Sequence, residues 1–222
     1  IVSRAFEQLK IDFGYNKLNG NFVSIGASYD YASLGCTHHC PEDINLMYNI
    51  PNMQIVVPGS SEEFDTLFNQ SYSNKNPTYF RLSDHENEKK FKVKFGRANF
   101  IDNKSKITIL AVGPVLNFIY PLIHKYNLNL IYLTTIRPFD QNIFKKISKK
   151  SNSIIVIEPF YSGAITNEII KSKDINKINI ENISVPFKFL TNYGTKKQHD
   201  DKLGFSIQKI EKIIKKLNKR PI

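Results

Sequence analysis

The sequence predicts an α/β protein made of two consecutive domains, each built around a parallel sheet. Short apolar runs alternate with amphipathic stretches along most of the chain. Many of these runs are apolar at every position, which is typical of strands buried on both faces of a parallel sheet. The alternation is interrupted by a charged stretch over residues 85–105. We therefore expect one domain over 1–84, a linker with a short hairpin around 92–100, and a second domain over 106–222.

The first domain is expected to alternate helices and strands. Ser60 and Glu63 have the spacing of a capping box at the start of a helix, and Pro41 and Pro51 bracket another helix. The first expected helix includes the start of the chain, two more begin at residues 41 and 61, and the expected strands cover 21–26, 54–57 and 77–82.

The second domain repeats the alternation without interruption. Its expected strands cover 107–112, 128–133, 153–157 and 185–190, and its expected helices cover 115–126, 141–149, 163–171 and 203–217. Such an order of continuous apolar strands and amphipathic helices predicts a parallel sheet with helices on both faces.

Composition excludes several classes of protein. The chain has 222 residues, 41% of them hydrophobic, and a formal charge of +11. The basic residues near the end interleave with apolar ones, which is typical of a solvated helix face, so we expect no nucleic-acid partner. No apolar run is long enough to span a membrane, and we expect no membrane association. Cys36 and Cys40 cannot form a disulfide framework, so we expect a reducing cytoplasm. Because the chain begins with Ile1 inside an expected helix, we also expect a fragment.

The most promising stretch for chemistry follows the strand that ends at Gly26. Ligands of open α/β sheets bind at the carboxyl ends of strands. The long segment after Gly26 brings His38 and His39 toward an expected helix start, where an anion or a developing oxyanion could be stabilised. The alternative is that the two histidines only cap the helix. Spacing alone leaves both interpretations open.

A metal site in this segment is disfavoured. Cys36, His38, His39 and Cys40 are possible zinc ligands, but one short loop could scarcely surround the ion with all four. No second cysteine cluster completes a shell. We therefore expect no metal ligands in this chain.

Several motifs resemble the transketolase family. The pyrimidine-binding domain of transketolases and 1-deoxyxylulose-5-phosphate synthases is similar to residues 3–8, 35–39, 42–44 and 50–53, which read Ser-Arg-Ala-Phe-Glu-Gln, Gly-Cys-Thr-His-His, Glu-Asp-Ile and Ile-Pro-Asn-Met. The family's carboxy-terminal domain is similar to residues 107–113, 136–140 and 156–158 with Gly163. Together they resemble the carboxy-terminal subunit of transketolases that are split into two polypeptides.

The resemblance implies a thiamine diphosphate enzyme that transfers a two-carbon ketol unit between a ketose and an aldehyde. It implies that the diphosphate and Mg²⁺ are held by a separate amino-terminal subunit, and that the glutamate and the aromatic residue that hold the aminopyrimidine lie ahead of residue 3. We therefore expect a pyrimidine domain whose front part is missing, active only in a hetero-oligomer with a diphosphate-binding partner. His38 matches the family's catalytic, substrate-contacting histidine, and Arg4 matches a segment that flanks the cofactor.

Tyr29 and Arg81 complete the expected substrate contacts, although Arg81 could equally be a solvent-exposed strand residue. Three family positions depart from the pattern. Leu34 replaces an acidic residue, Asp84 replaces a phosphate-binding arginine, and a histidine near Gly26 is absent. A sugar or sugar-phosphate substrate is expected, with a preference against phosphate. Two alternatives stay open: a β subunit of a 2-oxo acid dehydrogenase, and a non-catalytic assembly subunit.

Overall fold

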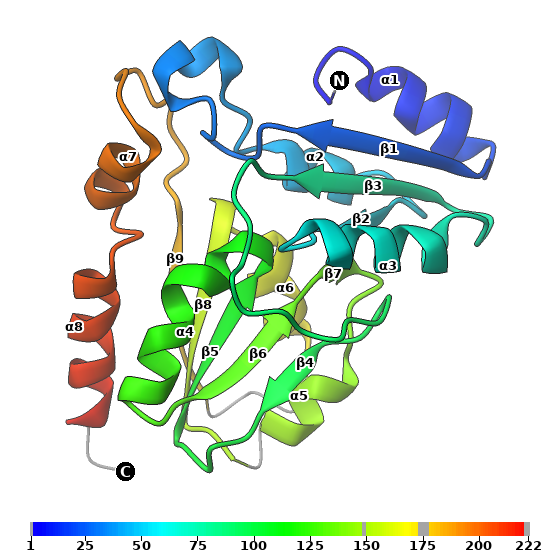
Figure 1. The fold of residues 1–222 in the computed structure, drawn as a ribbon. Coiled ribbons are helices and arrows are strands. Elements are labelled where there is room, and N and C mark those ends of the chain that lie inside the picture. The colour runs from blue at the N-terminus through cyan, green and yellow to red at the C-terminus, as the bar shows by residue number, and fades with distance from the viewer. Residues whose placement is uncertain (1, 148–149, 173–177, 220–222) are drawn as a thin grey trace.

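The structure is a computed structural model that describes residues 2–147, 150–172 and 178–219, without the side chains of 144–146. Two sheets form its framework (Figure 1). The first has the order β1-β3-β2-β7, with bounds Gly20–Ile25, Pro77–Leu82, Gln54–Val56 and Thr135–Arg137. The second has the order β4-β6-β5-β8-β9, with bounds Asn99–Ile101, Asn129–Leu133, Ile107–Val112, Ser153–Tyr161 and Asn179–Val185.

Strand directions confirm the expected α/β class. All pairs are parallel except that β7 runs antiparallel to β2 and β4 runs antiparallel to β6. The helices of the first part are α1 (Phe6–Gln8), its π-helical continuation η1 (Leu9–Tyr15), α2 (Asp43–Tyr48) and α3 (Ser61–Ser71). Those of the second part are α4 (Leu116–Lys125), α5 (Asn142–Ile147), α6 (Ala164–Lys171), α7 (Lys196–Leu203) and α8 (Ile207–Asn218).

The second sheet is covered on both faces, as its apolar strands require. Ile109 and Ala111 of β5 lie in one core cluster with residues of α4 and α8, whereas Leu110 and Val112 lie in another with residues of α5 and α6. This split follows from the two-residue period of a strand, which sends successive side chains to opposite faces. Figure 1 shows these helix pairs on the two sides of the sheet.

The two halves of the chain share their cores. Phe80 of β3 belongs to the same cluster as Ile109, and Met47 of α2 belongs to the same cluster as Leu110. The strand β7 adds a further link, because it lies in the second half of the sequence but pairs with β2 in the first sheet. The first and second sheets are therefore packed together, and the proposed domain boundaries stay predictions.

Some expected elements differ from those observed. The sequence predicts a strand over 185–190, but β9 ends at Val185, and Phe187 and Phe189 beyond it are exposed. As an edge strand, β9 carries several polar residues, so its sequence lacks the continuous apolar run of a central strand. The mainly charged helix α7 is absent from the expected elements for a related reason, since its hydrophobic periodicity is weak.

The expected hairpin and capping box are only partly formed. The hairpin is reduced to a single bridge between Lys94 and Arg97, because the segment that follows pairs with β6 as β4. Ser60 caps α3 by accepting a hydrogen bond from the backbone N–H of Glu63 at 3.3 Å. The Glu63 carboxylate, however, accepts from the backbone N–H of Gly59 and from the hydroxyl of Tyr132, so it connects α3 to the second sheet.

Candidate functional site

The segment that joins β1 to α2 is folded into a compact loop. A bridge between Ser28 and Cys40 closes it, with the Cys40 N–H donating to the Ser28 carbonyl at 2.7 Å. Two 3₁₀ turns lie inside it: η2 (Ala32–Leu34) and η3 (Cys36–His38). We call residues 27–40 the β1–α2 loop.

The histidine pair does not cap α2. His38 ends η3, whereas α2 begins at Asp43, and the Asp43 carboxylate accepts a hydrogen bond from the Ile44 N–H at 2.8 Å. Of the two interpretations of these histidines, the capping one is therefore wrong. His38 is exposed, and its Nδ1 lies 3.1 Å from the Thr37 hydroxyl.

His39 faces the other way. It is half-buried, and neither of its ring nitrogens finds a hydrogen-bond partner among the described residues. Its ring makes edge contact with that of buried His199 on α7, at 5.4 Å between centroids. Burial lowers the pKa of His39, and the neighbouring His199 lowers it further. His39 is therefore a neutral packing residue between the β1–α2 loop and α7.

Arg81 is the centre of a buried polar network, so the exposed-strand interpretation is wrong. Its side chain is 2% exposed, and its Nε donates to the Asp43 carboxylate at 2.7 Å. Its Nη2 donates to the Ser28 hydroxyl at 2.8 Å and to the Pro159 carbonyl at 3.3 Å. The hydroxyl of Tyr79 donates to the same carboxylate at 2.9 Å. This network ties β3, α2, the β1–α2 loop and β8 together.

Tyr29 joins the β1–α2 loop to α7. Its hydroxyl donates to the Asp200 carboxylate at 2.6 Å, and the Lys196 ammonium lies 5.2 Å above its ring. Lys196 also donates to Asp200 at 3.2 Å. Burial and the charge of Asp200 raise the pKa of Tyr29 well above its ordinary value, so the phenol stays protonated as a donor.

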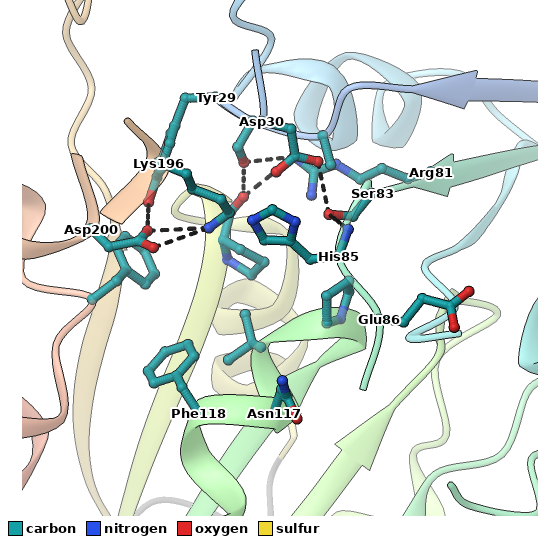
Figure 2. Close-up of a pocket in the computed structure, with 16 residues that line it drawn as sticks. Tyr29, Asp30, Arg81, Ser83, His85, Glu86, Asn117, Phe118, Lys196 and Asp200 are labelled. Atoms are coloured by element: carbon teal, nitrogen blue, oxygen red, sulfur yellow. Dashed lines mark hydrogen bonds and ion pairs between the residues drawn. The ribbon is translucent and has the colours of Figure 1, made fainter. Parts of the chain in front are cut away.

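A cavity of about 260 Å³ opens where these elements meet (Figure 2). Its walls come from the β1–α2 loop, the end of β3 with the residues after it, the start of α4, β8 and α7. Asp30 lines it and accepts a hydrogen bond from the Ser83 hydroxyl at 2.8 Å. Burial raises the pKa of Asp30. The cavity thus lies at the carboxyl ends of β1 and β3, where α/β sheets bind ligands.

The expected site residues fall into two places. Tyr29 and Arg81 both line the cavity, whereas His38 and Arg4 are exposed and lie outside it. Leu34 and Asp84 are exposed as well, and Asp84 pairs with His85 at 2.8 Å. Sequence reasoning missed Lys196 and Asp200, because no motif marks them and the weak periodicity of α7 hides the helix that carries them.

Metal ligation finds no support in the loop. Among residues 2–147, 150–172 and 178–219, no group of three or more His, Cys, Asp or Glu side chains is arranged to hold a metal ion. Burial raises the pKa of Cys40 to about 12, so its sulfur is a thiol in this structure. Within the same residues, no helix is long and apolar enough to cross a membrane.

The fold is of the α/β class, and its cavity lies at the carboxyl ends of β1 and β3. Comparison with known proteins adds a family match for the first part of the chain. Residues 2–88 match the family model of the transketolase pyrimidine-binding domain. This part of the chain is therefore a domain of the transketolase pyrimidine-binding type, and the chain as a whole resembles the transketolase family.

Two named enzymes are among the curated relatives of this chain. The chain is 26% identical over 226 residues to 1-deoxy-D-xylulose-5-phosphate synthase of Francisella philomiragia, covering 97% of this chain and 36% of the relative. It is 24% identical over 197 residues to one of the subunits of apulose-4-phosphate transketolase from Phocaeicola vulgatus, covering 83% of this chain and 63% of the relative. The chain thus spans less than two thirds of either relative.

The fold has a solved counterpart. A structure described as a split-gene transketolase, inactive β4 tetramer, superposes with a TM-score of 0.82 at 19% identity. The match covers 96% of this chain and 72% of that one. It supports the arrangement of both halves of the chain.

Proposed function

We propose that this chain is the carboxy-terminal half or subunit of a thiamine diphosphate-dependent transketolase-like enzyme, which transfers a two-carbon ketol unit from a ketose to an aldehyde in the cytoplasm. The observation that carries the proposal is the exposure of His38 on a loop whose inner side is fixed by Tyr29 and His39. The histidine that the family resemblance assigns to substrate has an exposed ring whose Nδ1 contacts the Thr37 hydroxyl. We propose that its ring reaches an oxyanion that develops on the substrate.

The cofactor would meet this chain on the outer side of the first sheet. Arg4 and His38 are both exposed, and Figure 1 shows the N-terminal segment and the 3₁₀ turns on the side of the first sheet that faces away from the second. We propose that both contact a cofactor that another subunit brings in. When bound, thiamine diphosphate supplies the carbanion-stabilising chemistry, and the protein supplies orientation and charge. We assign the diphosphate and Mg²⁺ to the partner.

In such a complex, His38 would orient the donor and donate a hydrogen bond to the oxygen that gains charge. Its 3₁₀ turn is attached to a rigid base, because the Ser28–Cys40 bridge and the Arg81 network hold both ends of the β1–α2 loop. The Nε and Nη2 of Arg81 donate to Asp43 and Ser28, and the Tyr29 hydroxyl donates to Asp200. We therefore propose that they position the loop rather than contact substrate through those atoms.

Exposed aromatic side chains support a partner subunit. Phe187, Phe189 and Tyr193 are 90%, 80% and 76% exposed and lie in one segment between β9 and α7. The Tyr193 ring lies against Gly35 in the β1–α2 loop. A run of exposed aromatics is typical of a protein interface. We propose that the diphosphate-binding subunit covers this segment when it approaches His38, and that the complex is a heterotetramer.

A second candidate is a non-catalytic assembly subunit. The observation that favours it is Asp84, a carboxylate at the position where the resemblance places a phosphate-binding arginine. An aspartate repels phosphate, so the ordinary sugar-phosphate contact is lost. If the enzyme is active, the same residue and Leu34 instead predict a donor without phosphate near this position.

Reconstitution tests the proposal. The chain alone and the chain mixed with a diphosphate-binding transketolase subunit would be titrated with thiamine diphosphate and Mg²⁺ by calorimetry, then assayed with a panel of ketoses and aldehydes. We expect binding and turnover only in the mixture. Binding in the mixture without turnover of any donor would favour the assembly subunit. Micromolar binding by the chain alone would contradict the proposal, since about 8 kcal/mol would then come from this chain.

A further inference from the structure

A second cavity, of about 500 Å³, shares no lining residue with the cavity described above. Its walls come from the end of α2, the turn that leads into β2, the end of β7 with the residues after it, and α6. The motif over 136–140 contributes Arg137, Pro138 and Phe139 to the lining, and the proposed function uses none of them. We call this space the Arg137 cavity. Its volume lies within the roughly 300–1,000 Å³ that is typical of small-molecule sites.

Arg137 is held in place by one part of its guanidinium. Its Nη1 donates to the backbone carbonyls of Tyr48 at 3.0 Å and of Ile50 at 3.1 Å. The guanidinium also lies over the Tyr48 ring, 5.2 Å from its centroid. A side chain fixed in this way loses little further freedom when a ligand binds to it, so Arg137 is preorganised.

The other edge of the same guanidinium is unused. Neither Nε nor Nη2 of Arg137 donates a hydrogen bond to any of the described residues, and none of their carboxylates forms an ion pair with it. Arg81 differs, because its Nε and Nη2 are the atoms that donate to Asp43 and Ser28. The N–H groups of a guanidinium form a rigid fork that matches the two oxygens of a carboxylate. Arg137 therefore offers an open fork to an oxyanion.

The acidic group of this lining is already paired. Glu168 is the one carboxylate among the described residues that line the Arg137 cavity. It accepts from the Lys171 ammonium at 3.0 Å and from the Gln141 amide at 2.8 Å, and the Tyr48 hydroxyl donates to it as well. Lys171 balances the charge of Glu168, so the charge of Arg137 is left without a counterion in the lining.

Gln54 adds a neutral donor to the same lining. Its Oε1 accepts from the Asn74 amide at 2.6 Å and from the Thr78 hydroxyl at 2.9 Å, so the amide oxygen is engaged. Its Nε2 donates to none of the described residues. The unused groups of Arg137 and Gln54 are thus donors, which is the arrangement that an anion requires.

The balance of charge favours a monoanion. A phosphate group carries about −1.5 to −2 charges at neutral pH, so Arg137 would leave part of that charge facing Glu168. A carboxylate carries a single negative charge, which Arg137 matches. We propose that the Arg137 cavity binds a small organic monocarboxylate, whose two oxygens accept hydrogen bonds from Nε and Nη2 of Arg137. The inference does not rest on the proposed function, because no residue of this lining takes part in that function.

Saturation-transfer NMR on the full chain tests the class of ligand. Benzoate is the probe, and benzamide is its neutral counterpart of nearly the same shape. We expect benzoate to bind at least about tenfold more tightly than benzamide, because only the carboxylate gains charge-assisted hydrogen bonds from the fork. Equal binding of the two probes, or no binding of benzoate, would overturn the proposal.

Competition separates a carboxylate site from a phosphate site. Acetate and inorganic phosphate are each titrated against bound benzoate at constant ionic strength, since surface charges are screened by salt. We expect acetate to displace benzoate at a lower concentration than phosphate does. The reverse order would show a phosphate site and would overturn the assignment to a carboxylate.

Variants locate the bound carboxylate. Arg137→Lys keeps the charge and removes the fork. Asn52→Asp places a negative charge in the lining, at an exposed position with a left-handed backbone that aspartate also tolerates. Each variant is expected to weaken benzoate binding by about tenfold and to leave benzamide binding unchanged. Asn127→Asp is the matched control, because Asn127 is also exposed and left-handed but lies outside the cavity.

The control is expected to bind benzoate as the wild-type chain does. Since Nη1 of Arg137 also holds two backbone carbonyls, Asn52→Asp decides the test if Arg137→Lys does not fold. Undiminished benzoate binding in Asn52→Asp would overturn the proposal. Equal weakening in Asn52→Asp and Asn127→Asp would also overturn it, because the net charge of the chain would then account for the effect.

Discussion

The two sides of the β1–α2 loop differ in nearly every physical property, although their residues alternate within one short segment. On the inner side, Tyr29 is 3% exposed and bonded to Asp200, and His39 packs against His199. On the outer side, Leu34 is 50% exposed and His38 is exposed. Adjacent residues of one motif therefore have separate tasks. The inner side fixes the loop, and we propose that the exposed outer side contacts substrate.

The largest effect on the free energy of unfolding should follow from breaking the buried Arg81 network, which holds the inner side of the loop. Arg81→Met leaves the Asp43 carboxylate buried without its ion-pair partner, which typically costs about 3–5 kcal/mol. Arg97→Met is the matched control, because Arg97 is 57% exposed and its contact with Asp140 is 3.5 Å. Such a pair is worth about 0–1 kcal/mol. Urea unfolding of both variants makes the comparison.

The same two variants can also revise the role of Arg81. If Arg81→Met unfolded at the same urea concentration as Arg97→Met but lost turnover in the reconstituted enzyme, Arg81 would act on the substrate and not on the loop.

A smaller effect should appear as a pH dependence of stability. The pKa of His39 is lowered in the folded protein, so the unfolded chain binds the proton more readily. The free energy of unfolding should therefore fall as the pH drops below about 6.5, the ordinary histidine value. His39→Phe should flatten this dependence. Thermal unfolding of the wild-type chain and of His39→Phe between pH 7.5 and 5.5 measures the difference, and an equally steep curve for His39→Phe would refute the assignment.

The smallest effect concerns the outer surface near the cavity. Asp84 is exposed and pairs with His85, so replacing it should not disturb the fold. In the reconstituted enzyme, Asp84→Arg should raise kcat/KM for xylulose 5-phosphate by roughly tenfold, because arginine binds phosphate through a charge-assisted fork. The value for a donor without phosphate should not change. Asp84→Ala serves as control, and an equal gain in that variant would show that relief of repulsion alone accounts for the effect.

The sequence is most informative where burial is complete. The expected strands over 77–82 and 107–112 match β3 and β5 residue for residue, because nearly every side chain in them is buried. The sequence does not predict the full extent of the edge strand β9 or the charged helix α7, because solvent exposure removes the hydrophobic pattern.

The site is predictable only in part. The motif around His38 marks a loop that borders the cavity, and Tyr29 and Arg81 do line that cavity. The contact of Tyr29 with Asp200, 171 positions away, leaves no trace in local spacing. Likewise, the pairing of Arg81 with Asp43 depends on how β3 packs against α2 and is visible only in three dimensions.

The most direct test compares His38→Ala with His39→Ala in the complex with a diphosphate-binding subunit, with turnover and unfolding measured on the same samples. We predict that His38→Ala lowers kcat/KM by roughly two to three orders of magnitude, the size expected for one preorganised donor, at an unchanged unfolding midpoint. We predict that His39→Ala loses about 1 kcal/mol of stability and keeps its turnover. The reverse outcome, in which His39→Ala loses turnover at unchanged stability, would contradict the division of the loop into a structural and a chemical side.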